Sequence, residues 1–227
     1  MTIVSRLTAT ALAVAFAVAS APALAVKPFS ANYQASYMGM QGNGRMALEP
    51  AGDNRWRYTL TIRNSLADLN QSTVFEEHEG RLRPVSGSDS SKVLVKKSNK
   101  QASYDWGRGV ATWTGDVKAD RSGPVKLQAG DLDALLINLA LVQDLAAGKP
   151  LRYRMVEDGR VKTMAYTVAG KESLTIDGKP HPATKLVNTS GDRQTTVWVI
   201  DGLPVPARIS QTTKGQDAID LRVQSLR

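Results

Sequence analysis

The stretch GDLDALLINLALVQDLAAGKP, residues 130–150, is the only long helical pattern in the chain. Asp131 or Asp133 can accept hydrogen bonds from the free N–H groups of a first helical turn, and Gly148 followed by Pro150 is typical of a helix end. The pattern therefore predicts one helix over about residues 131–147. Apolar residues cover most of its circumference, so the helix needs burial on more than one side. It is too short and too often interrupted by polar residues to span a bilayer.

The sequence on both sides of this helix is typical of β-strands. Residues 55–63, RWRYTLTIR, alternate apolar and polar side chains, which indicates a strand with one buried face. We predict further strands at residues 29–37, 45–49, 71–79, 82–88, 92–96, 101–106, 110–114, 151–156, 161–168, 174–176, 183–189, 194–200, 207–213 and 218–226. About a dozen short strands and one helix predict a mainly β fold, a curved antiparallel sheet or barrel wrapped on one central helix. The pattern does not distinguish a closed barrel from an open one.

Residues 1–25 have the pattern of a secretory signal peptide. Arg6 precedes an apolar run over residues 11–19, and Ala23-Leu24-Ala25 matches the small-x-small cleavage pattern. We therefore expect a single β-rich domain over residues 26–227 after cleavage. The chain has no cysteine, which excludes disulfides, thiolate metal sites and the lipid-bearing cysteine of a lipoprotein. Together these features predict a periplasmic protein with no lipid anchor and no further membrane segment.

The chain carries a net charge of +8 at pH 7, which favours anionic partners such as lipids or acidic envelope glycans. The basic residues are scattered along the predicted strands, so a solvated basic face is the stronger interpretation. No nucleic-acid-binding motif accompanies the charge, and we expect no nucleic-acid partner. The oligomeric state stays open.

The densest group of titratable residues is Glu76-Glu77-His78-Glu79. In a strand these side chains alternate between two faces, so they do not converge on one ion. The chain has no nucleophile elbow, phosphate-binding loop, dinucleotide fingerprint or His-Glu-x-x-His motif. We therefore predict no catalytic residue, no metal site and no cofactor. Enzyme activity stays open, because pairs of carboxylates of the glycosidase type have no sequence motif.

The combination of an apolar helix and aromatic strands favours a protein that binds a hydrophobic or amphipathic ligand, such as a lipid, an acyl chain or a glycolipid, between sheet and helix. The candidate ligand contacts are Tyr58, Trp113, Leu135, Leu139, Tyr153 and Trp198. All six could instead be ordinary core residues. Two alternatives remain: a structural or assembly partner of a cell-envelope complex, and a hydrolase of envelope polymers that uses carboxylates among Glu77, Glu79, Asp131 and Asp133.

Three segments together resemble an exported bacterial family known as domain of unknown function 3108. They are EGRLRP at residues 79–84, QAGDLDAL at residues 128–135 and TVWVIDGLPVPARI at residues 196–209. The resemblance implies a periplasmic β-barrel-like domain, similar in general design to the lipoprotein carrier proteins, which hold acyl chains between a curved sheet and a helix. It implies no catalytic residue. Likeness at the level of the fold does not transfer function.

Overall fold

The computed structural model describes residues 26–37 and 39–227. The expected signal peptide, residues 1–25, lies outside the described residues. The first half of the chain forms strands β1 (Phe29–Tyr37), β2 (Met40–Pro50), β3 (Arg55–Asn64), β4 (Ala67–His78), β5 (Arg81–Val93), β6 (Lys96–Asp105), β7 (Val110–Gly115) and β8 (Val125–Lys126). The second half forms helix α1 (Ala134–Ala146) and strands β9 (Arg152–Glu157), β10 (Arg160–Ala165), β11 (Thr167–Ile176), β12 (Lys179–Ser190), β13 (Arg193–Ile200), β14 (Arg208–Thr213) and β15 (Gln216–Leu226). A 3-10 helix, η1, covers Ala119–Arg121.

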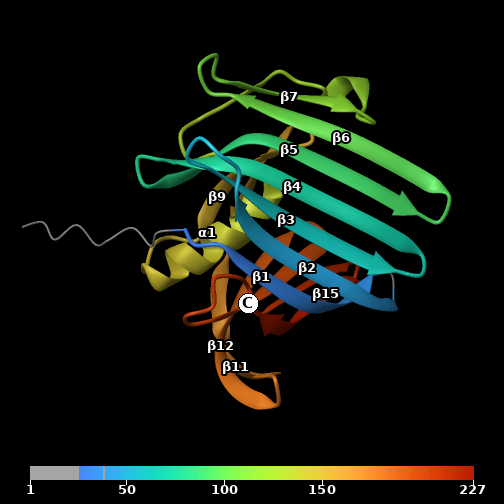
Figure 1. Ribbon diagram of the computed structural model, residues 1–227, viewed down its shortest axis with the longest axis vertical. Coiled ribbons are helices and arrows are strands. Elements are labelled where there is room, and N and C mark those ends of the chain that lie inside the picture. The colour runs from blue at the N-terminus through green and yellow to red at the C-terminus, as the bar shows by residue number, and fades with distance from the viewer. Residues whose placement is uncertain (1–25, 38) are drawn as a thin grey trace, which may run out of the picture.

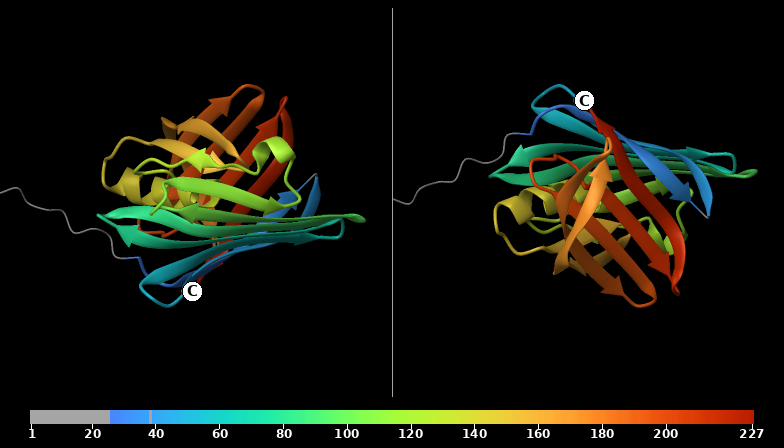
Figure 2. Two further views of the ribbon diagram at one scale, coloured as in Figure 1. Left: turned by 90° about the horizontal axis from the view of Figure 1, so that it is seen from above. Right: turned by 90° about the horizontal axis from the view of Figure 1, so that it is seen from below.

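Thirteen strands form one antiparallel sheet in the order β11-β12-β13-β14-β15-β1-β2-β3-β4-β5-β6-β7-β8. The order consists of two meanders joined where β1 pairs with β15, with Tyr33 opposite Val223. Figure 2 shows the two halves of the sheet as layers that cross at a steep angle, with α1 between them. The sheet is therefore strongly curved but open, with β11 and β8 at its two ends. This confirms the predicted mainly β fold wrapped on one helix.

Helix α1 lies in the concave side of the sheet, together with the separate two-stranded sheet of β9 and β10. Asp133 is the N-cap, and its side chain accepts a hydrogen bond from the N–H of Leu136. Leu132 forms a parallel bridge with Met155, so the helix begins at Ala134 and not at the predicted residue 131. At the other end Gly148 has a φ of 64°, the left-handed conformation that a helix-ending glycine allows.

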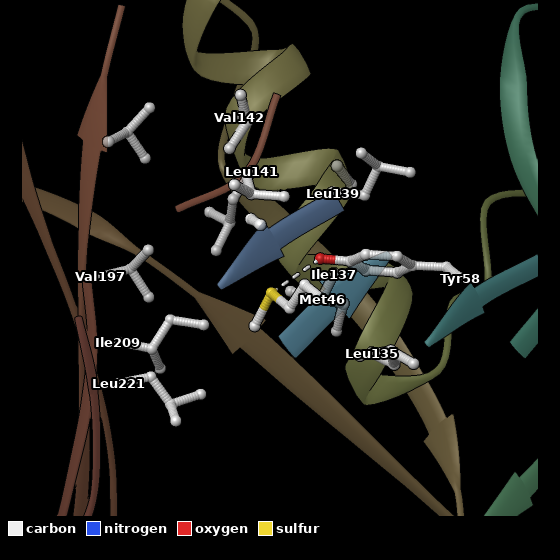
Figure 3. Close-up of a cluster of buried hydrophobic side chains, with 14 of the residues drawn as sticks. Met46, Tyr58, Leu135, Ile137, Leu139, Leu141, Val142, Val197, Ile209 and Leu221 are labelled. Atoms are coloured by element: carbon white, nitrogen blue, oxygen red, sulfur yellow. Dashed lines mark hydrogen bonds between the residues drawn. The ribbon is translucent and has the colours of Figure 1, made fainter. Parts of the chain in front are cut away.

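The helix is buried on several sides, as predicted. Leu135, Leu136, Ile137, Leu139, Ala140, Leu141 and Val142 are all buried. Figure 3 shows this helix beside Tyr58 and Met46 from one half of the sheet and beside Val197, Ile209 and Leu221 from the other. The helix thus lies between the two halves of the curved sheet and packs against both.

Three of the predicted strands differ from those in the structure. Residues 92–96 contain the turn between β5 and β6, where Leu94 adopts a φ of 54°. Residues 161–168 are divided at Tyr166, whose N–H donates to the carbonyl of Leu151. Up to Ala165 the segment pairs with β9 in the small sheet, and from Thr167 it pairs with β12 in the large one. Residues 174–176, predicted as a separate strand, are the end of β11.

Candidate functional site

A cavity of about 720 Å³ lies between the C-terminal half of α1 and the concave face of the sheet. Leu139, Val142 and Leu145 of the helix form one wall, and Phe29, Leu48, Val199 and Ile200 from β1, β2 and β13 lie around it. The loop after β13 contributes Leu203 and Pro204. This volume falls within the range of about 300–1,000 Å³ found for small-molecule sites.

The charged side chains of this cavity lie at its opening. Lys27, Lys171 and Asp201 are all exposed, whereas Phe29, Leu139 and Val199 on the walls are buried. Two cations and one anion leave an excess of positive charge at the entrance. An apolar interior with polar groups at one end suits a ligand that has an apolar body and a polar or acidic head.

A second cavity, of about 180 Å³, lies at the other end of α1 and is polar. Asp89, Asp133, Glu157 and Asp158 line it together with Lys100. The Asp133 carboxylate accepts from the Thr73 hydroxyl at 2.5 Å and from the Leu136 N–H at 2.8 Å. Asp158 is paired with Lys100 at 3.1 Å and with Arg121 at 3.3 Å. Both aspartates therefore stabilise the fold, as a helix cap and as an ion-pair centre.

Glu157 is the carboxylate of this group whose titration is most strongly altered. Burial raises its pKa to about 8, and the negative charges of Asp133, Asp89 and Asp158 add to the rise, while a backbone hydrogen bond from Ala134 opposes it. Burial also raises the pKa of Asp133, although its hydrogen bonds from Thr73 and Leu136 work against the rise. A third cavity, of about 290 Å³, shares Gln71 and Glu157 with the polar one.

The four carboxylates considered for a hydrolase do not gather in one cleft. Glu77 and Glu79 are exposed at the end of β4, and Glu79 lies in the turn that follows. Asp131 is 1% exposed, forms an ion pair with Arg154 and accepts the N–H of Gln128 at 2.8 Å. Asp133 caps the helix. Within residues 26–37 and 39–227, three or more potential metal-ligating side chains nowhere come together.

The structure distributes the six predicted ligand contacts over several places. Leu139 lies on the wall of the large cavity, and Trp113 and Leu135 line the polar one. The buried Tyr58 hydroxyl contacts the Met46 sulfur at 3.2 Å, and the Tyr153 hydroxyl donates to Asp144 at 3.1 Å. These two tyrosines are on the wall of none of the three cavities.

Trp198 lies on the opposite face of β13 from the cavity residue Val199. The Arg208 guanidinium lies 4.5 Å and the Lys185 ammonium 5.5 Å from the centre of its ring, and its indole N–H donates to Glu172 at 2.7 Å. This cover of charged side chains leaves the ring only 5% exposed. Trp198 therefore stabilises the outer face of the sheet in the structure.

Val142 and Leu145 are cavity residues that the list of predicted contacts omits. Both are on the helical face of Leu139, at positions three and six residues further along, so the period of the helix could have identified them. Glu157 was also missed. It follows Tyr153 and Met155 with the period of two of a strand, which places a carboxyl group on a face that is otherwise apolar.

The family model described as "Protein of unknown function (DUF3108)" matches residues 31–222. No curated protein sequence matches the chain. Among solved structures, the fold is similar to that of a β-barrel-like protein of domain of unknown function DUF1849 from Brucella abortus. The TM-score is 0.53 at 11% identity, over 88% of this chain and 97% of that one.

Two further solved structures are similar to a lesser degree. A MucB structure has a TM-score of 0.39 and 13% identity, over 88% of this chain and 52% of that one. A domain from Vibrio parahaemolyticus, provisionally described as an outer membrane lipoprotein-sorting protein domain, has a TM-score of 0.23 and 10% identity. The match covers 88% of this chain and 84% of that one. These scores are too low to establish a shared fold. No helix in the described part of the chain is long and apolar enough to cross a membrane.

Proposed function

We propose that this chain, which belongs to the DUF3108 family, is a non-enzymatic cell-envelope protein that binds an amphipathic ligand between its sheet and its helix. The ligand class is a lipid, an acyl chain or a glycolipid. The protein acts in the periplasm as a single domain over residues 26–227, after removal of the signal peptide.

The observation that carries this proposal is the cavity of about 720 Å³ beside α1. Natural cores are packed at nearly crystalline density, and spaces larger than a water molecule are few. A space of this size between a helix and a sheet lacks the dispersion contacts that a packed core gains, and an apolar ligand restores them. Its walls come from three parts of the chain that are far apart in the sequence: the β1–β2 hairpin, α1 and β13.

The entrance specifies the head of the ligand. Lys27 precedes β1 and Lys171 belongs to β11, so the two ammonium groups come from segments far apart in the chain to one opening. An acidic or phosphorylated head at this position gains charge-assisted hydrogen bonds, whereas a cationic head is repelled. We therefore expect an anionic amphiphile to bind more tightly than a cationic one with the same chain.

The test is native mass spectrometry of protein isolated gently from the periplasm, followed by organic extraction and lipid analysis. We expect a lipid or glycolipid in stoichiometric amount, displaced by added anionic amphiphile. The Val142→Trp variant fills the cavity from the helix and should lose the ligand. Val168→Trp, the same substitution at an exposed position of β11, is the matched control.

A folded Val142→Trp protein that retains the ligand in the same amount as Val168→Trp would contradict binding in this cavity. An intact mass that begins at Val26, in a periplasmic fraction, checks the predicted cleavage separately. A chain that keeps residues 1–25 or fails to leave the cytoplasm would contradict the proposed location.

A further inference from the structure

The turn between β5 and β6 presents two neighbouring apolar side chains to solvent. Leu94 is 63% exposed and Val95 is 95% exposed, the two largest values among the exposed large hydrophobic residues of the described chain. In Figure 1 the turn lies at the far end of two long strands. Scattered single apolar residues are normal on a protein surface, but an adjacent pair at the tip of a hairpin is unusual.

The local conformation also disfavours these residues. Four other two-residue hairpin turns here are Glu79-Gly80, Asp158-Gly159, Asp177-Gly178 and Lys214-Gly215, and in each the glycine has positive φ. Leu94, at a φ of 54°, has the same conformation as the residue before the glycine in those turns, and Val95 stands where each of them has glycine. A Cβ atom is unfavourable in that region, and turn chemistry favours Asn-Gly or Asp-Gly. Neither the turn geometry nor solubility accounts for Leu-Val at this tip.

Three exposed lysines surround the apolar tip. Lys92 and Lys97 lie directly opposite each other across β5 and β6, and Lys96 is opposite Val93. Like charges directly opposite each other are destabilising. Asp68 is the cross-strand neighbour of Lys92, but its carboxylate is bonded to Arg63 at 3.3 Å. Among the described residues, no ion pair includes any of these three lysines, so their charge is available to an external anion.

We propose that the tip formed by Leu94 and Val95 inserts into the surface of an anionic phospholipid bilayer, with Lys92, Lys96 and Lys97 against the headgroup phosphates. Apolar side chains that enter the boundary between headgroups and acyl chains supply a hydrophobic contribution, and nearby basic residues add attraction to anionic lipids. The long stems of lysine allow the ammonium groups to stay at the headgroups while the tip goes deeper.

This inference is independent of the ligand cavity, which lies at the other end of the strands. Phe29 and Leu48, which pair across β1 and β2, border the cavity, whereas the β5–β6 turn lies at the end where Tyr37 pairs with Met40. The register places Ala67 opposite Val93 at that same end. A protein held by this tip therefore keeps the opening of the cavity away from the bilayer.

The test is co-sedimentation of the mature chain with vesicles of phosphatidylcholine alone or with about 30% phosphatidylglycerol, at about 0.1 M salt. We expect binding to the anionic vesicles, weaker at high salt, and little to the neutral ones. Leu94→Ser with Val95→Ser, and separately Lys92, Lys96 and Lys97 all changed to Gln, should each weaken binding roughly tenfold or more.

Two control variants separate the tip from general surface properties. Val161→Ser with Val168→Ser removes two exposed apolar residues from β10 and β11 and should bind as the wild type does. Changing Lys118, Lys126 and Lys179 to Gln removes the same charge elsewhere and should cost much less than the tip lysines. The three control lysines are all exposed and lie outside the β5–β6 hairpin.

A direct readout comes from the natural absence of cysteine. A polarity-sensitive fluorophore on Val95→Cys should shift to the blue on anionic vesicles, and one on Val168→Cys should not. The proposal is overturned if the wild type does not sediment with anionic vesicles, or if the Ser variant of the tip binds as tightly as the wild type. Equal losses for the two lysine variants overturn it as well.

Discussion

Asp133 joins the helix to the sheet through two hydrogen bonds. Its carboxylate accepts the Leu136 N–H at the start of α1 and the hydroxyl of Thr73 in β4, and both residues are nearly fully buried. We expect Asp133→Ala to lower the free energy of unfolding by about 1–3 kcal/mol, because it removes the cap and leaves the Thr73 hydroxyl without a partner. Urea denaturation measures this. Asp133→Asn keeps an acceptor and should cost less, and an Ala variant as stable as the wild type would contradict the assigned role.

Glu157 makes stability depend on pH in a defined window. Its pKa is about 8 in the folded protein against an ordinary value of 4.5, so the folded state retains a proton that the unfolded state releases. The contribution of Glu157 to stability is therefore fully present below pH about 4.5. It decreases as the pH rises to about 8 and does not change further above that pH. Glu157→Gln removes the titration and should be more stable than the wild type by about 4–5 kcal/mol at pH near 8.5, with little difference near pH 4.

Denaturation curves at several pH values measure this effect. Glu77→Gln, at an exposed position of β4, is the control, and its difference from the wild type should not change with pH. A wild type and a Glu157→Gln variant with parallel pH profiles would show that Glu157 does not titrate in this window.

At the scale of single residues, the sequence indicates which side chains share a face but not which face is inside. In β13 both faces are covered, so alternation cannot tell that Val199 lines the cavity while Trp198 lies under Arg208. Leu139 differs from the residues of β13 because it lies on a helix inside a concave sheet. Such a helix borders a cavity wherever its packing against the sheet leaves space. Side-chain volumes across several elements determine that space, and no local pattern reports it.

The Asp-Gly turns of two hairpins give a matched test at the scale of elements. A Cβ atom on Gly159 would lie 2.2 Å from the carbonyl oxygen of Arg121 in η1, whereas one on Gly178 would meet nothing within 4 Å. Both glycines have positive φ, so alanine costs about 1 kcal/mol at either site from backbone strain. We expect Gly178→Ala to lose about that much stability and Gly159→Ala to lose about 2–4 kcal/mol. Equal losses in urea denaturation would contradict the packing of the β9–β10 turn against η1.

The elements were predictable to different degrees for physical reasons. The helix and its C-terminal end follow from local features, the apolar circumference and Gly148, whereas the bridge between Leu132 and Met155 decided its start at Ala134. The amphipathic strand β3 is equally local. The division of residues 161–168 depends on pairing with β9 before Tyr166 and with β12 after it, and the turn between β5 and β6 has Val95 where four other hairpin turns have glycine. In the first case contacts outside the segment determined the structure. In the second case the turn contains residues that turn chemistry disfavours.

At the scale of the molecule, the pairing of β1 with β15 makes the sheet continuous. Ala31, Tyr33 and Ala35 of β1 and Leu221 and Val223 of β15 are all nearly fully buried. By contrast, most residues of β11, at one end of the sheet, are exposed. We expect hydrogen exchange to show amides of the β1–β15 pair opening only with global unfolding, and amides of the β11–β12 pair exchanging faster through local opening. Similar rates in the two regions would contradict this hierarchy.

The same pairing explains why the strand order could not be predicted. The sequence indicates strands and turns, and meanders follow because neighbouring strands usually pair. Nothing local tells that the first and last strands of the domain are partners, because register over such a separation depends on the whole sheet. The prediction of a curved antiparallel sheet on one helix was therefore confirmed, while its open form emerged only in three dimensions.

That partnership has a consequence for biogenesis. Strand β1 cannot be completed until residues 216–226 are available, so the two halves of the sheet stay unjoined while the chain is still emerging. Contacts between such distant segments slow folding, because a long loop must close before they form. Under the periplasmic location proposed above, this delay keeps the two halves of the sheet unpaired while the chain is translocated. The pairing of β15 with β1 is then the last step, which completes the sheet.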